Sequence, residues 1–489
     1  MTGERGQASV EYTGLLLVVA VLLAAAVMAD LPAPEAPTWL AASMCAAWKG
    51  ERCAAGRDVA HRLGRSDGRR RFGRGVGPPG REDRSLLDSS RRGPWGRTWP
   101  GPRALTTTAP GRAVALPPSP QAGAAATALS GHDTAPTADS LDRLSPADQR
   151  AVALARAEVV GPLDGAPPRM RYAANRVLLG REVARLGREV EQVDRGIAGR
   201  RRAIAQGAPP MPQYVRIRQA ERLRAELIGR SRRFAGWAAD PRRSFLLFDP
   251  RGDGRAAEVV GDLDRAPHVA VMVPGMGSDI DNFDEHLAPR AHELRAAAHR
   301  HAGADVAVIA WLGYDPPDTV PGAALGGRAR VGARSLARFV GALEDRRDAH
   351  TTVVGHSYGS VTTGTAAAEE RMAADDVVFT GSPGTGGGRR DVSELGALSR
   401  FWAGEAPYDI VAPAPAHGEA PGDPGFGTRL FDASGEERPP HHVEHNHQSY
   451  YRRGSASLRN LANIVGAWPD DVTHPPSRPP ILPRSRGFW

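Results

Sequence analysis

One five-residue pattern constrains the fold of this chain more than any other feature. The pattern Gly-x-Ser-x-Gly at residues 355–359 follows the apolar residues 351–355 and precedes a segment of small residues, 359–371. A serine on a sharp turn between a buried strand and a helix needs glycine on both sides, because the two elements approach closely there. The pattern alone occurs often by chance in a chain with 56 glycines. The strand before it and the helix after it make Ser357 a candidate nucleophile.

Short apolar runs alternate with helical stretches around this pattern. The predicted strands are residues 268–273, 305–311, 351–355, 376–380 and 400–403, and the predicted helices are residues 284–301, 323–348, 359–371 and 455–467. Two further runs, 245–248 and 258–260, are joined by a glycine-rich turn and predict a β-hairpin. Strands that alternate with helices predict a largely parallel sheet covered by helices on both faces, so the expected fold class is α/β.

Upstream of the sheet, residues 141–240 are predicted to be helical. Ser145 is followed by a proline and, three residues later, by an acid, which is a typical helix start. Residues 169–206 and 214–237 are rich in Ala, Arg, Glu and Leu and flank a Gly-Ala-Pro-Pro turn. They predict a helical hairpin, which either caps a functional site or serves as a spacer.

The net charge of the chain is confined to one segment. The formal net charge is +8, and residues 57–103 hold 13 arginines and five acids, which accounts for the whole surplus. Residues 31–140 are rich in Pro, Gly, Ala and Ser without an apolar period, which predicts a disordered linker. No binding fold with interleaved aromatic residues is visible there, so a solvated spacer is favoured over a polyanion site and no nucleic acid is expected as a partner.

The first 30 residues predict attachment to a membrane. Residues 13–29 form an uncharged apolar run, long enough for a membrane-spanning helix or for the core of a signal peptide. The preceding residues 6–12, Gly-Gln-Ala-Ser-Val-Glu-Tyr, resemble the leader of Flp-type (type IVb) pilins. The resemblance implies cleavage after Gly6 by a prepilin peptidase and a link to pilus machinery. Cleavage after Ala29 and an uncleaved anchor are the alternatives. Cleavage after Ala29 predicts an exported protein, and the other two cases predict a single-pass membrane protein. In every case the C-terminal domain is expected outside the cytoplasm.

Four short motifs resemble one family when they are taken in order. They are Val-Pro-Gly-Met-Gly at 273–277, Leu-Gly-Tyr-Asp-Pro-Pro at 312–317, Gly-His-Ser-Tyr-Gly-Ser at 355–360 and Gly-Ser-Pro-Gly at 381–384. Together they resemble the actinobacterial α/β-hydrolase family formerly called DUF1023. The resemblance implies an α/β-hydrolase domain over residues 241–489 and a nucleophilic serine, and it implies no known substrate.

The expected oxyanion donors and the expected acid lie on either side of Ser357 in the sequence. An α/β-hydrolase carries its oxyanion loop where the strand 269–273 ends, so the backbone amides of Met276 and Tyr358 are the expected donors. The strand that begins near residue 401 is followed by a turn with two acids. Asp409 is the expected partner of a catalytic histidine, and Glu405 is the alternative.

Four histidines within residues 441–447 compete for the role of the base. The resemblance favours His447, because a tyrosine follows three residues later just before the last helix; His445 is the alternative. The cluster lacks the carboxylate and histidine helix signature of a metal site, so neither a metal nor an organic cofactor is expected. His356 is expected to have a structural role.

These observations predict a membrane-anchored serine hydrolase that cleaves an ester or related acyl bond in a small molecule or a lipid. Ser357 is expected to attack the carbonyl, His447 to accept the proton and Asp409 to orient the imidazole. Two other interpretations stay open. One is a pilus-associated or surface structural protein with an inert hydrolase-fold module, and the other is a polyanion-binding surface protein that acts through residues 57–103.

Overall fold

The computed structural model describes residues 119–129, 138–301, 303–345, 348–412, 416–435 and 443–475. All of them belong to one compact unit. The predicted leader and membrane segment, residues 1–30, lie outside the described residues, as do the arginine-rich residues 57–103 and His441 and His442. No helix in the described ranges is long and apolar enough to cross a membrane.

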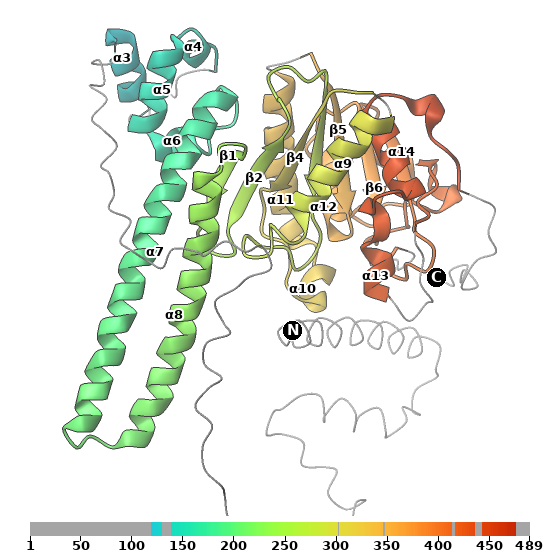
Figure 1. Ribbon diagram of the computed structural model, residues 1–489. Coiled ribbons are helices and arrows are strands. Elements are labelled where there is room, and N and C mark those ends of the chain that lie inside the picture. Colours follow the sequence, from blue (N-terminus) through green and yellow to red (C-terminus); the bar gives the residue numbers. More distant parts are fainter. Residues whose placement is uncertain are drawn as a thin grey trace, which may run out of the picture. The chain divides into compact units, whose positions relative to one another are not determined.

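An eight-stranded sheet forms the centre of the fold (Figure 1). Its strand order is β1-β2-β4-β3-β5-β6-β7-β8. The hairpin strands β1 and β2 are antiparallel to each other, β2 is antiparallel to β4, and all other neighbours are parallel. The strands are β1 (Ser244–Asp249), β2 (Arg255–Val260), β3 (His268–Val273), β4 (Val306–Leu312), β5 (His350–His356), β6 (Asp376–Thr380), β7 (Arg400–Gly404) and β8 (Arg429–Leu430). The predicted α/β class with a largely parallel sheet is confirmed.

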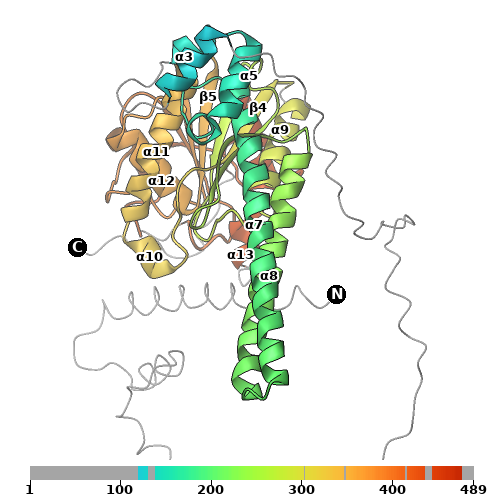
Figure 2. The same ribbon diagram turned by 90° about the vertical axis from the view of Figure 1, so that its left-hand side faces the viewer.

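Helices cover both faces of the sheet (Figure 2). Helices α9 (Leu287–His301) and α14 (Ala456–Val465) pack together on one face, and α11 (Gly327–Glu344) and α12 (Tyr358–Glu369) pack on the other. The single helix predicted over residues 323–348 is interrupted, because Gly326 adopts a φ of +61° between α11 and the short preceding helix.

The buried side chains form one apolar cluster on each face of the sheet. Successive residues of a strand alternate between the clusters, as Val308 and Ile309 of β4 do. All seven residues of β4 are buried, because helices lie on both sides. A strand buried on both faces reads as a continuous apolar run, which explains why the strand positions could be predicted from the sequence.

Two long helices, α7 (Pro168–Ala205) and α8 (Pro210–Ala239), form the predicted helical hairpin. Near its base the hairpin covers the free edge of β1. Asn175 Nδ2 donates to Phe245 O at 2.8 Å, and Arg171 Nε donates to Leu246 O at 2.9 Å. These side chains satisfy carbonyl groups that an edge strand otherwise leaves open. On α8, Trp237 is buried and its ring stacks on Phe245 at a centroid distance of 5.0 Å.

Four short helices and the start of α7 form a third apolar cluster. The short helices are α3 (Pro120–Ala128), α4 (Ala138–Asp142), α5 (Pro146–Ala155) and α6 (Ala157–Val160). Helices α5 and α6 pack against α7, and α3 packs against α5. The linker predicted over residues 31–140 therefore ends earlier than expected. Helix α3 starts as α5 does, since the Ser119 side chain accepts from the Ala122 amide ahead of a proline. Its alanine-rich sequence has no apolar period, so a packed helix at these residues is not predictable from the sequence.

Candidate active site

Ser357 lies on a sharp turn between β5 and α12. Its φ is +55° and its ψ is −129°, a strained conformation for a residue other than glycine. The Ser357 amide donates to Thr380 O at 2.9 Å, which holds the turn against β6. A Cβ atom at Gly359 would overlap Val273 O and lie 2.7 Å from Pro274 O. The turn predicted at residues 355–359 is confirmed, and its glycine at 359 is needed for contact with β3.

The loop after β3 lies against the nucleophile. A Cβ atom at Gly275 would lie 2.7 Å from Ser357 Cβ, so the loop backbone touches the serine side chain. The Gly277 amide donates to Pro317 O at 3.0 Å, which fixes the far end of the loop. Tyr358 is the first residue of α12, where a backbone amide has no acceptor within the helix. Ser357 thus has the Met276 loop on one side and is followed directly by the Tyr358 amide.

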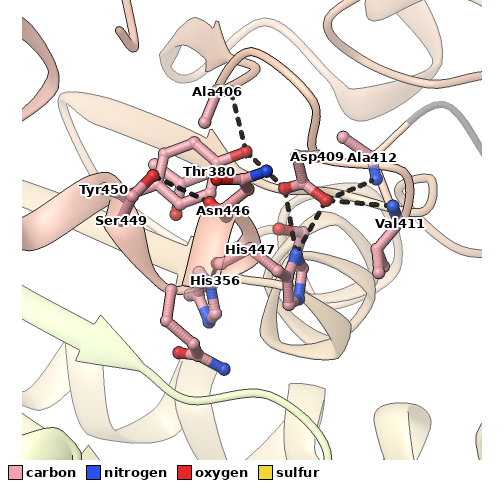
Figure 3. Close-up of polar contacts among 12 residues, drawn as sticks. His356, Thr380, Ala406, Asp409, Val411, Ala412, Asn446, His447, Ser449 and Tyr450 are labelled. Carbon is pink, nitrogen blue, oxygen red and sulfur yellow. Dashed lines mark hydrogen bonds and ion pairs between the residues drawn. The ribbon is translucent and has the colours of Figure 1, made fainter. Parts of the chain in front are cut away.

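Asp409 and His447 form a buried pair (Figure 3). His447 Nδ1 lies 2.9 Å from Asp409 Oδ2 and 3.0 Å from Asp409 Oδ1. Asp409 is in the loop after β7, and His447 is the last residue of the short helix α13 (Val443–His447). The two residues are 38 positions apart in sequence, so only the fold brings them together.

The Asp409 carboxylate accepts hydrogen bonds from three further groups. Tyr450 Oη donates to Oδ2 at 2.6 Å, and the amides of Val411 and Ala412 lie 2.9 Å and 3.4 Å from Oδ1. Burial alone raises the pKa of Asp409, but the charge of His447 and these hydrogen bonds hold that pKa below its ordinary value. The carboxylate therefore stays ionised beside His447 although it is buried.

Tyr450 links the carboxylate to the backbone of the acid loop. Its hydroxyl donates to Asp409 and accepts from the Ala406 amide at 2.9 Å, and its side chain is fully buried (Figure 3). Burial and the charge of Asp409 raise the pKa of Tyr450 well above its ordinary value, so the phenol keeps its proton. The sequence indicates Tyr450 only as the third residue after His447, and it has no local signal for the contact with Asp409.

His356 ties the turn of Ser357 to the segment of His447. Its side chain is buried, and its Nε2 lies 2.8 Å from His447 O. A carbonyl only accepts, so His356 Nε2 carries a proton and donates it. Burial, together with the charges of His447 and Arg290, lowers the pKa of His356 well below 6.5. The predicted structural role of His356 is therefore a specific one, because the contact positions the backbone of His447.

Gly381 provides the space in which the acid and the histidine meet. Its φ is +56°, and a Cβ atom there would lie 2.9 Å from Asp409 Oδ2 and 3.0 Å from His447 Cε1. Only glycine avoids both the strained backbone and these contacts. The sequence pattern Gly-Ser-Pro-Gly drew attention to residues 381–384, but not to this role.

The structure brings together some of the predicted site residues and leaves others apart. Asp409, the expected acid, bonds to His447, the histidine favoured from the sequence. Within the described ranges, the Ser357 hydroxyl makes no hydrogen bond to His447. Such bonds are often loose without substrate and tighten when it binds. No group of three or more His, Cys, Asp or Glu among the described residues is placed to hold a metal ion.

Comparison with known proteins agrees with the α/β fold of this region. Residues 249–419 match the model of a family described as alpha/beta hydrolase. An uncharacterized protein of Mycobacterium tuberculosis is 31% identical over 362 residues, which cover 64% of this chain and 52% of the relative. An uncharacterized protein of Mycobacterium bovis is 38% identical over 161 residues, which cover 30% of this chain and 60% of the relative. The chain thus spans about half the length of the first relative.

Solved structures resemble the chain more distantly. A dienelactone hydrolase from Anabaena variabilis is 15% identical with a TM-score of 0.30, and the match covers 48% of this chain and all of that one. A carboxyl esterase from Tuber melanosporum is 11% identical with a TM-score of 0.32, and the match covers 47% of this chain and 89% of that one. The family match, together with the sheet order and the turn at Ser357, identifies the C-terminal region as an alpha/beta hydrolase fold.

Proposed function

We propose that this chain is a serine hydrolase that cleaves an ester or a related acyl bond in a small molecule or a lipid. The observation that supports this most strongly is the buried Asp409–His447 pair beside the strained turn of Ser357. Because His447 bonds to Asp409 through Nδ1, its Nε2 is the nitrogen left to accept a proton from serine.

In the proposed reaction Ser357 Oγ attacks the carbonyl carbon and transfers its proton to His447 Nε2. Asp409 holds the imidazole in the required tautomer and stabilises its protonated form. The Met276 and Tyr358 amides donate to the oxyanion. The leaving group takes the proton from His447, and water then attacks the acyl-enzyme by the same route, which restores Ser357.

Hydrolysis of short nitrophenyl esters tests this proposal. The variants Ser357→Ala and His447→Ala are expected to lose about 10⁴-fold or more of kcat, as removal of a nucleophile or base does in related chemistry. Ser335→Ala is the matched control, since Ser335 lies on α11 and, among the described residues, its hydroxyl bonds only to Val331 O. A Ser357→Ala variant with the wild-type rate would contradict the proposal and favour an inert hydrolase-fold module.

We also propose that residues 13–29 anchor the protein in a membrane with the C-terminal domain outside the cytoplasm. The support is the sequence of the first 30 residues alone, together with the resemblance of residues 6–12 to pilin leaders. A prepilin peptidase is the proposed processing partner, and the actinobacterial family formerly called DUF1023 is the proposed family. The first residue of the mature protein, read by mass spectrometry, separates cleavage after Gly6 from cleavage after Ala29 and from no cleavage.

A further inference from the structure

The far half of the helical hairpin is built differently from its base. We call residues 195–224 the distal arm; it contains the end of α7, the turn and the first half of α8. The base buries Leu179, Leu186 and Trp237 in the core cluster of the sheet. In the distal arm only Ile197 and Ile217 are buried. The arm therefore has no packing partner in the described chain except its own second helix.

The distal arm projects from the edge of the sheet that carries Ser357. Arg230 Nη2 on α8 donates to Pro250 O at 3.0 Å, just beyond the end of β1. Since β1 and β4 are both antiparallel to β2, β1 ends at the same edge as the parallel strands, and Ser357 directly follows β5. Helix α8 begins at Pro210, so the arm extends roughly 30 Å past this edge at 1.5 Å per residue (Figures 1 and 2).

The surface of the distal arm is strongly basic. Residues 195–224 contain eight arginines and one acid, Glu221. Within the described part of the chain, four exposed guanidinium groups of the arm lie outside ion-pair distance of any carboxylate; they belong to Arg202, Arg216, Arg218 and Arg222. Folding leaves these charges available to an anionic partner.

Large apolar side chains lie exposed among these arginines. Met211 is 70% exposed, and Tyr214, Val215 and Leu223 are about half exposed. Residues 211, 215, 218 and 222 are spaced by four, three and four, so they share one face of α8. Ile217, which is buried in the hairpin, lies on the opposite side. This face of α8 thus carries two exposed apolar side chains, Met211 and Val215, followed by two unpaired arginines, Arg218 and Arg222.

We propose that the distal arm docks on an anionic lipid surface. Guanidinium groups bind phosphate head groups, and neighbouring apolar side chains enter the boundary between head groups and acyl chains. A nucleic acid would use the same arginines, but it offers no apolar layer for Met211, Tyr214 and Val215. Docking by the arm turns the edge of the sheet with Ser357 toward the lipid surface. The proposal does not depend on which bond, if any, Ser357 cleaves.

A polarity-sensitive dye at the tip of the arm tests the proposal in the full chain. The dye is attached to Met211→Cys in a background with Cys45→Ser and Cys53→Ser, and a second protein carries it at Val331→Cys, an exposed site on α11. Vesicles of phosphatidylglycerol and phosphatidylcholine are expected to shift the emission at position 211 to shorter wavelength. Vesicles of phosphatidylcholine alone, and the dye at position 331, are expected to give no shift. The readout is local, so binding through the N-terminal residues does not imitate it.

Charge variants complete the test. Changing Arg202, Arg216, Arg218 and Arg222 to Gln is expected to abolish the shift at position 211. The matched control changes four exposed arginines elsewhere, Arg150, Arg330, Arg334 and Arg338, to Gln and is expected to keep it. An absent shift with anionic vesicles, an equal shift at position 331, or a response to a short DNA duplex but not to vesicles would each overturn the proposal.

Discussion

At the scale of single residues, the site depends on an ionised carboxylate that is taken out of water. Asp409 is 6% exposed, and a buried carboxylate is costly unless donors surround it. Its two oxygens accept from His447, Tyr450 and two backbone amides. This set of donors stabilises the charge that orients the histidine. The orientation of His447 therefore depends on groups that hold Asp409 and have no proposed part in the reaction itself.

Tyr450→Phe is expected to weaken this set of donors. The change removes a 2.6 Å bond to a charged acceptor and leaves the buried Ala406 amide without an acceptor. Hydrogen bonds to charged groups contribute about 1.5–3 kcal/mol, so the free energy of unfolding in denaturant is expected to fall by about that amount. The pKa of Asp409 is expected to rise, which moves the loss of activity in acid to higher pH.

Tyr451→Phe is the matched control for this prediction. Tyr451 is also buried, but in the described part of the chain its hydroxyl bonds only to the neutral Thr380 hydroxyl, at 3.3 Å. Its loss is expected to cost about 1 kcal/mol or less and to leave the acid limb of activity in place. Equal effects of the two variants on stability and on the pH profile would show that the Tyr450–Asp409 bond is unimportant.

The sequence indicated the residues of the pair but not their support. Asp409 and His447 could be selected because their order along the chain and the resemblance pointed to them. Neither the order of the residues nor the resemblance indicates which groups surround the carboxylate of Asp409. Tyr450 and Gly381 both act through contacts with Asp409, from which they are 41 and 28 positions away in the sequence. Contacts between residues so far apart leave no local pattern in the sequence.

At the scale of elements, the turn of Ser357 depends on how closely α12 approaches β3 and β5. A Cβ atom at Gly355 would lie 2.9 Å from Ser360 Cα, and one at Gly359 would meet the carbonyl oxygens of Val273 and Pro274. These contacts are with backbone atoms, which do not move aside as flexible side chains do. The close approach is therefore a property of the whole strand, turn and helix unit.

Gly359→Ala and Gly341→Ala are expected to have opposite effects on stability. Overpacking against backbone at Gly359 is expected to lower the free energy of unfolding by roughly 1–3 kcal/mol or more and to displace Ser357. Gly341 lies within α11, and a Cβ atom there meets nothing within 4 Å. Alanine is therefore expected to stabilise that helix by about 0.5–1 kcal/mol. Denaturant unfolding measures both values, and a stabilising Gly359→Ala would contradict this description of the turn.

Elements were predictable where burial or periodicity is continuous. The buried strands and the long helices α7 and α8 were found with ends close to those observed. The two-residue strand β8 and the five-residue helix α13 are too short to show a period, although α13 carries His447. Short elements of this kind are set by tertiary contacts rather than by local sequence.

At the scale of the whole molecule, the base of the helical hairpin is part of the sheet domain. Phe234 and Trp237 belong to the same apolar cluster as α9 and α14, and Asn175 bonds to β1 across 70 residues of sequence. The sequence predicted the hairpin but left open whether it caps the site or acts as a spacer. The base of the hairpin covers the edge of the sheet, whereas its distal arm extends beyond the sheet. Both parts have the same helical periodicity, so the sequence does not distinguish the packed part from the projecting part.

Covalent labelling shows whether the fold activates Ser357 as a nucleophile. The full chain is treated with a fluorophosphonate, and mass spectrometry identifies the modified residue. We expect one modification, at Ser357, that is lost in Ser357→Ala and strongly slowed in His447→Ala and Asp409→Asn. Folded wild-type protein that does not react, or labelling that persists in Ser357→Ala, would contradict this expectation.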